Sequence, residues 1–185
     1  MKAASAELAF VDARRELVPI MEDGLASGEI PARIVHGDTK LNNVLFDCDT
    51  GRPRCIVDLD TCMPGYALYD FGDLVRFTAA TAAEDARDME RVDVDLELYR
   101  ALTDGYLAGA GSALTPRERE LMPTAARLVT LTIGMRFLAD YLAGDVYFKT
   151  ETGDHNLARA RVQFGLVRAM EQRLPKGYRP TVVAP

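Results

Sequence analysis

The chain of 185 residues carries 22 Lys and Arg against 28 Asp and Glu, a formal net charge of −6, and 48% of its residues are hydrophobic. This length and composition suit one soluble globular domain with a sizeable core, and the acidic balance argues against a nucleic-acid partner. No run of 18 apolar residues occurs and the N-terminus lacks a signal-peptide core, so we expect no membrane partner and a cytoplasmic location.

The first 35 residues are predicted to be helical. Their apolar residues recur at helical spacing, in a stripe formed by Ala4, Leu8, Val11, Val18 and Leu25. Pro19 should kink or split this helix, because proline lacks a backbone N–H and clashes with the preceding turn.

Three short apolar runs follow, at residues 33–35, 44–46 and 55–57. Each predicts a strand, and the second and third flank a polar turn that ends in Gly51. Two such runs around a turn form a β-hairpin, which folds back on itself. Asn43 at its entry and Asp58 at its exit are therefore expected to lie side by side.

The residues around this hairpin occur in the order that phosphoryl transfer requires. The motif His-Gly-Asp-Thr-Lys-Leu-Asn-Asn occupies residues 36–43. Asp38 can accept the proton of an attacking hydroxyl, and Lys40 is placed to meet a γ-phosphate. Asn43 and Asp58 can bind one Mg²⁺, which prefers oxygen ligands and takes most of them from phosphate and water. Protein kinases space their catalytic Asp and metal-binding Asn in the same way, in H-R-D-L-x-x-x-N.

Each of these side chains also has an ordinary structural role open to it. Asp and Asn near a turn usually form caps or Asx turns, and Lys40 could be a solvated surface cation. The position of Asp58 at the end of a strand favours a metal and phosphate site for the set. His36 is expected to be structural, packing and hydrogen-bonding to shape the loop.

The sequence Asp70-Phe71-Gly72 spells the metal-binding tripeptide of protein kinases. It follows a predicted loop at residues 61–66, whereas Asp58 follows an apolar strand, so Asp58 is the better candidate for the metal. We expect Asp70 and Asp73 to cap the next helix and to brace the catalytic loop through hydrogen bonds to its backbone.

A second partial match to a known motif begins at Asp58. Residues 58–61 approach the signature of the haloacid dehalogenase phosphatases, in which the first Asp is a nucleophile. Cys62 breaks that match, and the phosphatase interpretation leaves residues 36–43 unexplained.

The rest of the chain is predicted to be mostly helical. Thr115, Pro116 and Glu118 mark a helix start. Residues 121–143 are apolar nearly all round and should be buried, with Pro123 near the beginning. Other helices are expected at residues 69–80, around 96–106 and at 156–174, before a proline-containing tail at 176–185.

The three cysteines, Cys48, Cys55 and Cys62, lie seven residues apart and form no C-x-x-C pair. We expect reduced, partly buried thiols and no zinc site.

Residues 36–43 with Ile56-Val57-Asp58 resemble the aminoglycoside phosphotransferase and choline kinase superfamily, a branch of the kinase fold. Residues 38–40, 58–61, 63–65, 70–73, 134–138, 144–150 and 154–157 are similar to the N-acetylhexosamine 1-kinases. The resemblance runs from about residue 36 to about residue 172. It implies ATP as phosphate donor and Mg²⁺ as cofactor.

The same resemblance implies that Asp38, Thr61, Arg136 and Tyr147 face a sugar whose anomeric hydroxyl is phosphorylated. On residue type alone, Arg136 in an apolar helix is equally consistent with a core arginine paired with an acid. Tyr147 on the same basis is more commonly a packing residue.

The expected fold is α+β, mainly α: a small β-hairpin carries the catalytic loop and packs on a helical bundle, as in the C-terminal lobe of a protein-kinase-like fold. Residues 1–175 would form this lobe. No Gly-rich loop between strands precedes residue 36, and Lys2 is the only lysine before Lys40, so the N-terminal nucleotide-binding lobe is expected to be absent.

The predicted function is ATP- and Mg²⁺-dependent phosphorylation of a sugar hydroxyl by a truncated catalytic lobe similar to an N-acetylhexosamine 1-kinase. Asp38 and Lys40 would be catalytic, and Lys40, Asn43 and Asp58 would contact the nucleotide phosphates and metal. The alternatives are phosphorylation of an aminoglycoside, choline or homoserine, or a non-catalytic sugar-binding remnant. We expect the isolated chain to be inactive and to self-associate through an exposed lobe interface.

Overall fold

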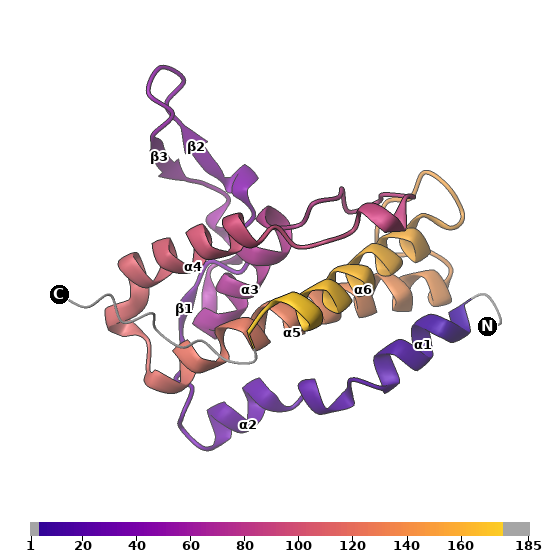
Figure 1. Ribbon diagram of the computed structural model, residues 1–185, viewed down its shortest axis with the longest axis horizontal. Coiled ribbons are helices and arrows are strands. Elements are labelled where there is room, and N and C mark those ends of the chain that lie inside the picture. The colour runs from indigo at the N-terminus through magenta and orange to yellow at the C-terminus, as the bar shows by residue number, and fades with distance from the viewer. Residues whose placement is uncertain (1–3, 176–185) are drawn as a thin grey trace.

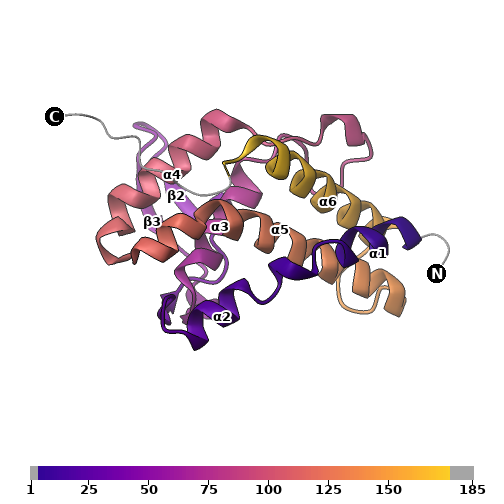
Figure 2. The ribbon, with the colours of Figure 1, turned by 60° about the horizontal axis from the view of Figure 1, so that its bottom comes forward.

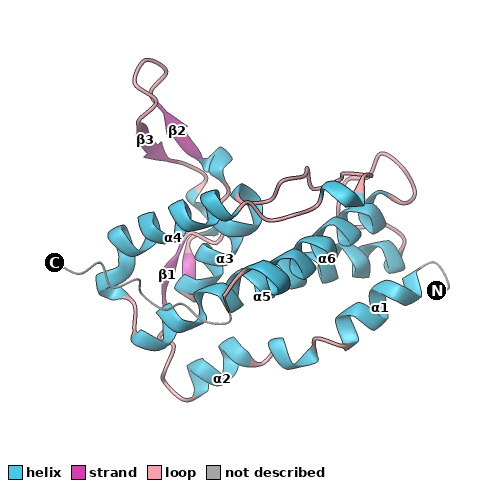
Figure 3. Cartoon of the chain, in the orientation of Figure 1, coloured by secondary structure: helices cyan, strands magenta, loops and turns pink. Residues whose placement is uncertain are grey.

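The computed structural model describes residues 4–175 (Figure 1). Helices make up most of this part, and its named strands form two small antiparallel pairs (Figure 3). The helices are α1 (Ser5–Asp12), α2 (Ile20–Ala26), α3 (Ala67–Thr78), α4 (Leu96–Ala110), α5 (Pro116–Ala143) and α6 (His155–Arg173). The strands are β1 (Arg33–Val35), β2 (Val44–Phe46), β3 (Pro53–Ile56) and β4 (Met63–Gly65). This composition agrees with the expected mainly α member of the α+β class. The predicted tail at 176–185 lies outside the described residues.

The long helix α5 is the centre of the bundle and packs against both α3 and α6. It begins as predicted: the Thr115 hydroxyl accepts the Glu118 N–H at 3.1 Å, and the Glu118 carboxylate accepts the Thr115 N–H at 2.7 Å. This capping box satisfies N–H groups that a helix start leaves unpaired. The predicted burial of residues 121–143 is confirmed for most of them, but Thr132 and Arg136 are exposed and line a cavity.

Two clusters of buried apolar side chains hold the helices together. One joins α3, α4 and the first half of α5 around Phe71 and Met122. The other joins α1, α6 and the second half of α5, with the rings of Phe10 and Phe164 stacked at 4.9 Å between centroids.

The N-terminal segment lies along the bundle as two separate helices (Figure 2). Pro19 stands immediately before α2, as its predicted helix-splitting role requires. The predicted apolar stripe is only partly a core face, because Ala4 is buried but Leu8, Val18 and Leu25 are exposed, whereas Phe10 and Met21 outside the stripe are buried. The break between α1 and α2 resets the helical phase, so one periodicity cannot describe both.

The predicted hairpin is confirmed, with β2 and β3 paired antiparallel so that Val44 lies opposite Ile56. This hairpin stands away from the helices in Figure 1. The loop predicted at residues 61–66 is wrong in part, because Met63–Gly65 forms β4 and pairs with β1. Pro and Gly give this segment low strand propensity, and only its long-range pairing makes it a strand.

The three cysteines are free thiols, and all of them are exposed, so the prediction of partial burial is wrong. Cys48 and Cys55 belong to the β2–β3 hairpin, which projects away from the helices that could have covered them (Figure 1). Among the described residues, no helix is long and apolar enough to cross a membrane.

Candidate active site

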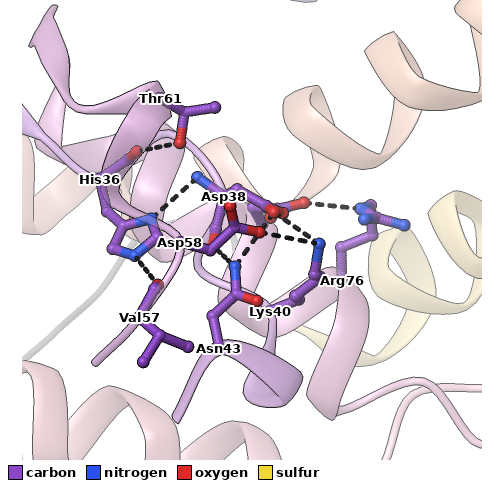
Figure 4. A network of polar contacts seen from close by, with 9 residues as sticks. His36, Asp38, Lys40, Asn43, Val57, Asp58, Thr61 and Arg76 are labelled. Carbon is purple, nitrogen blue, oxygen red and sulfur yellow. Dashed lines mark hydrogen bonds and ion pairs between the residues drawn. The ribbon is translucent and has the colours of Figure 1, made fainter. Parts of the chain in front are cut away.

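The loop between β1 and β2 brings the predicted base, cation and amide together (Figure 4). Lys40 Nζ lies 2.6 Å from Asp38 Oδ2. Asn43, in the short 3₁₀ turn Leu41–Asn43, donates its amide N–H to the Asp38 backbone oxygen at 2.8 Å and to Asp38 Oδ2 at 3.1 Å. Because the Asn43 nitrogen is committed to Asp38, its Oδ1 is the atom left to accept a hydrogen bond or bind a cation.

Asp58 reaches the same place from the other end of the hairpin. Its Oδ2 lies 3.9 Å from Lys40 Nζ, and the preceding N–H of Val57 donates to the Asn43 carbonyl at 2.9 Å. Asp58 has a left-handed backbone conformation with φ of 65°. That conformation is uncommon for a residue with a side chain and costs about 1–3 kcal/mol, which surrounding contacts must offset. The expected approach of Asn43 and Asp58 is thus seen in the fold.

The charges of this cluster stabilise one another. Burial raises the pKa of the Asp38 carboxyl, but hydrogen bonds from Lys40 and Asn43 outweigh burial and hold the pKa below its ordinary value. The hydrogen bond to Asp38 raises the pKa of the Lys40 ammonium. At neutral pH, Asp38 is therefore a carboxylate able to accept a proton, and Lys40 is a cation able to meet an anionic ligand.

His36 has the loop-shaping arrangement expected for it. Its Nδ1 accepts the Asp38 N–H at 3.3 Å, which leaves Nε2 as the protonated nitrogen that donates to the Val57 carbonyl at 3.2 Å. The imidazole therefore links the catalytic loop to the strand end before Asp58. Both ring nitrogens are occupied by backbone groups, so His36 has a positioning role here.

Asp70 in α3 braces the catalytic loop, as predicted. Its carboxylate accepts the N–H of His36 at 2.8 Å and of Gly37 at 2.9 Å, and its backbone oxygen accepts the Thr39 hydroxyl at 2.6 Å. Gly37 has φ of 82°, and a Cβ there would come within 2.9 Å of the Thr61 carbonyl. The close approach of two backbones therefore requires glycine at this position.

The helix-capping role expected for Asp70 and Asp73 is wrong. Helix α3 already begins at Ala67, so both residues lie inside it. Within residues 4–175, Asp73 shows no hydrogen bond to the loop; its Oδ1 accepts the Arg76 Nε–H at 2.9 Å.

A cavity of about 660 Å³ opens beside Asp38. Its lining includes apolar and aromatic residues, among them Tyr66 and Tyr69, whose ring centroids are 5.3 Å apart. The lining also includes polar and charged side chains: Asp38, Thr61, Asp70, Asp73, Arg76, Thr132 and Arg136. Its size and mixed lining suit a small ligand with both apolar and polar faces.

The structure brings three of the four sugar-facing candidates to this cavity. Asp38, Thr61 and Arg136 line it, and the Thr61 hydroxyl donates to the His36 carbonyl at 2.7 Å. Tyr147 is not in the lining and is 72% exposed. It lies beside Arg136, whose guanidinium carbon is 5.7 Å from the Tyr147 ring centroid.

The segment that carries Tyr147 is held by Asp140 of α5. This carboxylate accepts the backbone N–H groups of Val146, Tyr147 and Phe148 at 2.9–3.0 Å, and the amide of the buried Asn156 at 2.8 Å. Sequence analysis missed this clamp and also missed Arg76 in the cavity wall. Arg76 had one available signal, its position three residues after Asp73 in a helix.

Asn43 Oδ1 and the Asp58 carboxylate are the two oxygen ligands that this cluster could offer to a cation, since the Asn43 nitrogen is bonded to Asp38 and Asp58 lies 3.9 Å from Lys40. Within residues 4–175 no three His, Cys, Asp or Glu side chains converge into a group that could hold a metal. Two protein oxygens nevertheless fit Mg²⁺, which usually keeps waters and takes further oxygens from substrate phosphates.

Residues 2–121 of the chain match the family model described as the phosphotransferase enzyme family, APH. The matched span contains the catalytic loop at 36–43, Asp58 and Arg76, and it ends before Arg136 and Tyr147.

Proposed function

The chain belongs to the phosphotransferase enzyme family, and from this premise we propose that it transfers the γ-phosphate of ATP to a hydroxyl of a neutral sugar, with Mg²⁺ as cofactor. The observation that carries the proposal is the position of Asp38. Its carboxylate contacts Lys40 and Asn43 on one side and lines the 660 Å³ cavity on the other. A hydroxyl bound in the cavity could therefore donate its proton to Asp38, next to the Lys40 and Asn43 side chains that are proposed to meet the phosphate and the metal.

In the proposed reaction, the acceptor hydroxyl loses its proton to Asp38 Oδ2 or Oδ1 as its oxygen attacks the γ-phosphorus. The bond from that phosphorus to the β,γ-bridging oxygen breaks, and ADP leaves with the electron pair. Lys40, whose ammonium contacts the Asp38 carboxylate at 2.6 Å, would stabilise the negative charge of the transferred phosphoryl group. Such transfer depends mainly on positioning and electrostatic stabilisation, which the network around residues 36–43 provides.

Asn43 and Asp58 are the proposed metal ligands. When bound, Mg²⁺ neutralises charge on the phosphate oxygens and holds them in line for attack. The left-handed backbone of Asp58 is consistent with a residue constrained for such a task.

The lining of the cavity carries charges of both signs. Three carboxylates, Asp38, Asp70 and Asp73, face the same cavity as two guanidinium groups, Arg76 and Arg136. These opposite charges largely compensate one another, so the cavity presents no strong net charge that would select a polycationic aminoglycoside or the quaternary ammonium of choline. A neutral sugar ring can place its C–H face on a tyrosine ring of the lining and its hydroxyls on the polar side chains. By resemblance the acceptor is an N-acetylhexosamine phosphorylated on its anomeric hydroxyl. Homoserine, whose carboxylate Arg136 could bind, is the second candidate.

The surface around Asp58 and the β2–β3 hairpin, where the nucleotide is proposed to bind, is not covered by any other described part of the chain. The Asp58 side chain is 48% exposed, and Leu45, Phe46 and Ile56 of the hairpin are exposed apolar residues. We also propose that a further lobe must cover this face to bind ATP tightly. The 185-residue chain alone would then bind ATP weakly and transfer no phosphate, and its exposed apolar face would favour self-association.

The test uses the purified 185-residue chain, because the whole cavity lies within its described residues. Ligand-observed NMR should detect N-acetylglucosamine or N-acetylgalactosamine and not choline or kanamycin. Mn²⁺ with ATP should bind wild type more tightly than Asp58→Ala, measured by electron paramagnetic resonance, with Asp60→Ala as the matched control. Binding of kanamycin or choline alone would refute the sugar proposal. Robust phosphate transfer by the isolated chain would refute only the requirement for a further lobe.

A further inference from the structure

Arg76 of α3 is the least exposed cation in the wall of the acceptor cavity. Its side chain is only 10% exposed, although it lines the same cavity as Asp38. Figure 4 shows it at the edge of the polar network that contains Asp38 and Lys40. A guanidinium this far from bulk water needs hydrogen-bond acceptors for its N–H groups.

Protein groups satisfy only part of that need. The Nε–H of Arg76 donates to Asp73 Oδ1 at 2.9 Å, and one terminal nitrogen donates to Glu84 Oε1 at 3.0 Å. A guanidinium has five N–H donors in a fixed plane. Among the described residues, the second terminal nitrogen of Arg76 has no hydrogen-bond acceptor. Its N–H groups are therefore available to a ligand in the cavity.

The charge balance around Arg76 determines what kind of ligand suits it. Asp73 and Glu84 place two carboxylates on one guanidinium, so the local charge is already compensated. An anionic ligand would add a third negative group at this point. Neutral oxygens, such as sugar hydroxyls, can accept the remaining N–H groups without that penalty.

We propose that Arg76 is an acceptor-binding residue that donates to adjacent hydroxyl oxygens of a neutral sugar ring, while Asp73 and Glu84 fix the plane of its guanidinium. This inference rests on the proposed sugar kinase function and adds a specificity residue to it. Tyr66 and Tyr69 line the same cavity and offer an apolar surface for the face of the sugar ring. That surface cannot distinguish hydroxyl positions, so in this proposal the hydrogen bonds from Arg76 decide which hydroxyls are recognised. A site built to hydrogen-bond a hydroxyl discriminates strongly against analogues that lack it.

The deciding experiment measures dissociation constants of N-acetylglucosamine and its monodeoxy analogues for wild type and variants of the 185-residue chain. Arg76→Met should weaken binding of the parent sugar about ten- to a hundredfold. At least one deoxy analogue should bind wild type correspondingly weakly and should lose nothing further in Arg76→Met. Such coupling to one hydroxyl would not arise from a purely structural arginine.

Arg127→Met is the matched control, because Arg127 donates to Pro123 and Thr124 within α5 and does not line the cavity. It should bind every sugar as wild type does. If Arg76→Met does not fold, Arg76→Lys, which keeps the charge and loses the planar fork, is compared over the same analogues and should lose the same hydroxyl.

Unchanged sugar affinity in folded Arg76 variants would overturn this inference and leave the proposed function standing. Equal affinity of wild type for all deoxy analogues would overturn it as well. Failure of wild type to bind any N-acetylhexosamine would instead refute the proposed function, and the role of Arg76 with it.

Discussion

Two loops of this protein are each held by a carboxylate from a neighbouring helix, and they differ in how that hold is distributed. The catalytic loop at 36–43 is held by Asp70, and also by the hydroxyls of Thr39 and Thr61. The loop at 144–150 is held chiefly by Asp140, which accepts three backbone N–H groups and the Asn156 amide, while Asn156 and Arg159 of α6 each add one hydrogen bond to the loop.

The difference follows from what each loop must leave open. The catalytic loop borders a cavity, so its contacts come from several directions and leave Asp38 accessible. The 144–150 loop packs onto α5 and α6, and Asp140 is buried. In the 144–150 loop, much of the stabilisation therefore depends on one buried carboxylate. In the catalytic loop, several separate hydrogen bonds hold the geometry, so the loss of one of them should matter less.

Removing the Asp140 carboxylate should be the most damaging single change. Asp140→Ala leaves four N–H donors without their acceptor, and we expect the unfolding temperature to fall by roughly 10 °C. Differential scanning calorimetry measures this fall. Ala139→Ser, one residue away on the exposed side of α5, is the control and should be neutral. A fall no larger than that of the control would show that water replaces Asp140.

The strand that leads into the catalytic loop should be the next most sensitive point. Arg33 donates to both oxygens of the fully buried Glu118, at 3.1 and 2.8 Å. Glu118→Ala removes this pair and the α5 capping box, so we expect a loss of about 2–3 kcal/mol of unfolding free energy in urea titrations.

Glu120→Ala removes an exposed pair with Arg117 on the same helix and serves as the control for Glu118. It should change the unfolding free energy very little. Equal losses of unfolding free energy in Glu118→Ala and Glu120→Ala would contradict the expected contribution of the Arg33–Glu118 pair, which ties β1 to α5.

Asp70→Ala should affect the catalytic loop locally more than it affects global stability. Amide hydrogen exchange should accelerate at His36 and Gly37, because their acceptor is gone, while Val146 and Tyr147 keep their protection. In Asp140→Asn the pattern should be reversed. Simultaneous acceleration of both loops in either variant would show that they are not held independently.

The smallest expected effect is the contribution of Asp140 to acid sensitivity. Burial raises the pKa of its carboxyl, but hydrogen bonds from Phe148, Tyr147, Val146 and Asn156 outweigh burial and keep the pKa below the ordinary value. Since the unfolded pKa is about 3.9, this stabilisation is complete above about pH 5 and is lost as the pH falls through the lower folded value.

Urea titrations between pH 3 and 6 test the sign of this effect. Wild type should lose more stability than Asp140→Asn as the pH falls below about 4. Parallel pH profiles for the two proteins would contradict the lowered pKa.

Sequence alone was sufficient for features that depend on neighbours in the chain. The hairpin follows from two apolar runs around a Gly turn, the α5 start from Thr115 and Glu118, and the approach of Asn43 to Asp58 from hairpin geometry. The brace by Asp70 was also foreseeable, because Asp70 follows the hairpin closely and its carboxylate suits loop N–H groups.

Tertiary structure decided the features that depend on distant partners. Strand β4 exists because β1 lies beside it, the buried face of the first helices was set by a break in helical phase, and Arg76 meets Glu84 only through the fold of the following loop. Tyr147 likewise lies outside the lining of the 660 Å³ cavity, in a segment whose backbone is bonded to Asp140. Local patterns encode backbone geometry over a few residues, but the side chain that satisfies a buried donor can come from anywhere in the chain, and packing alone selects it.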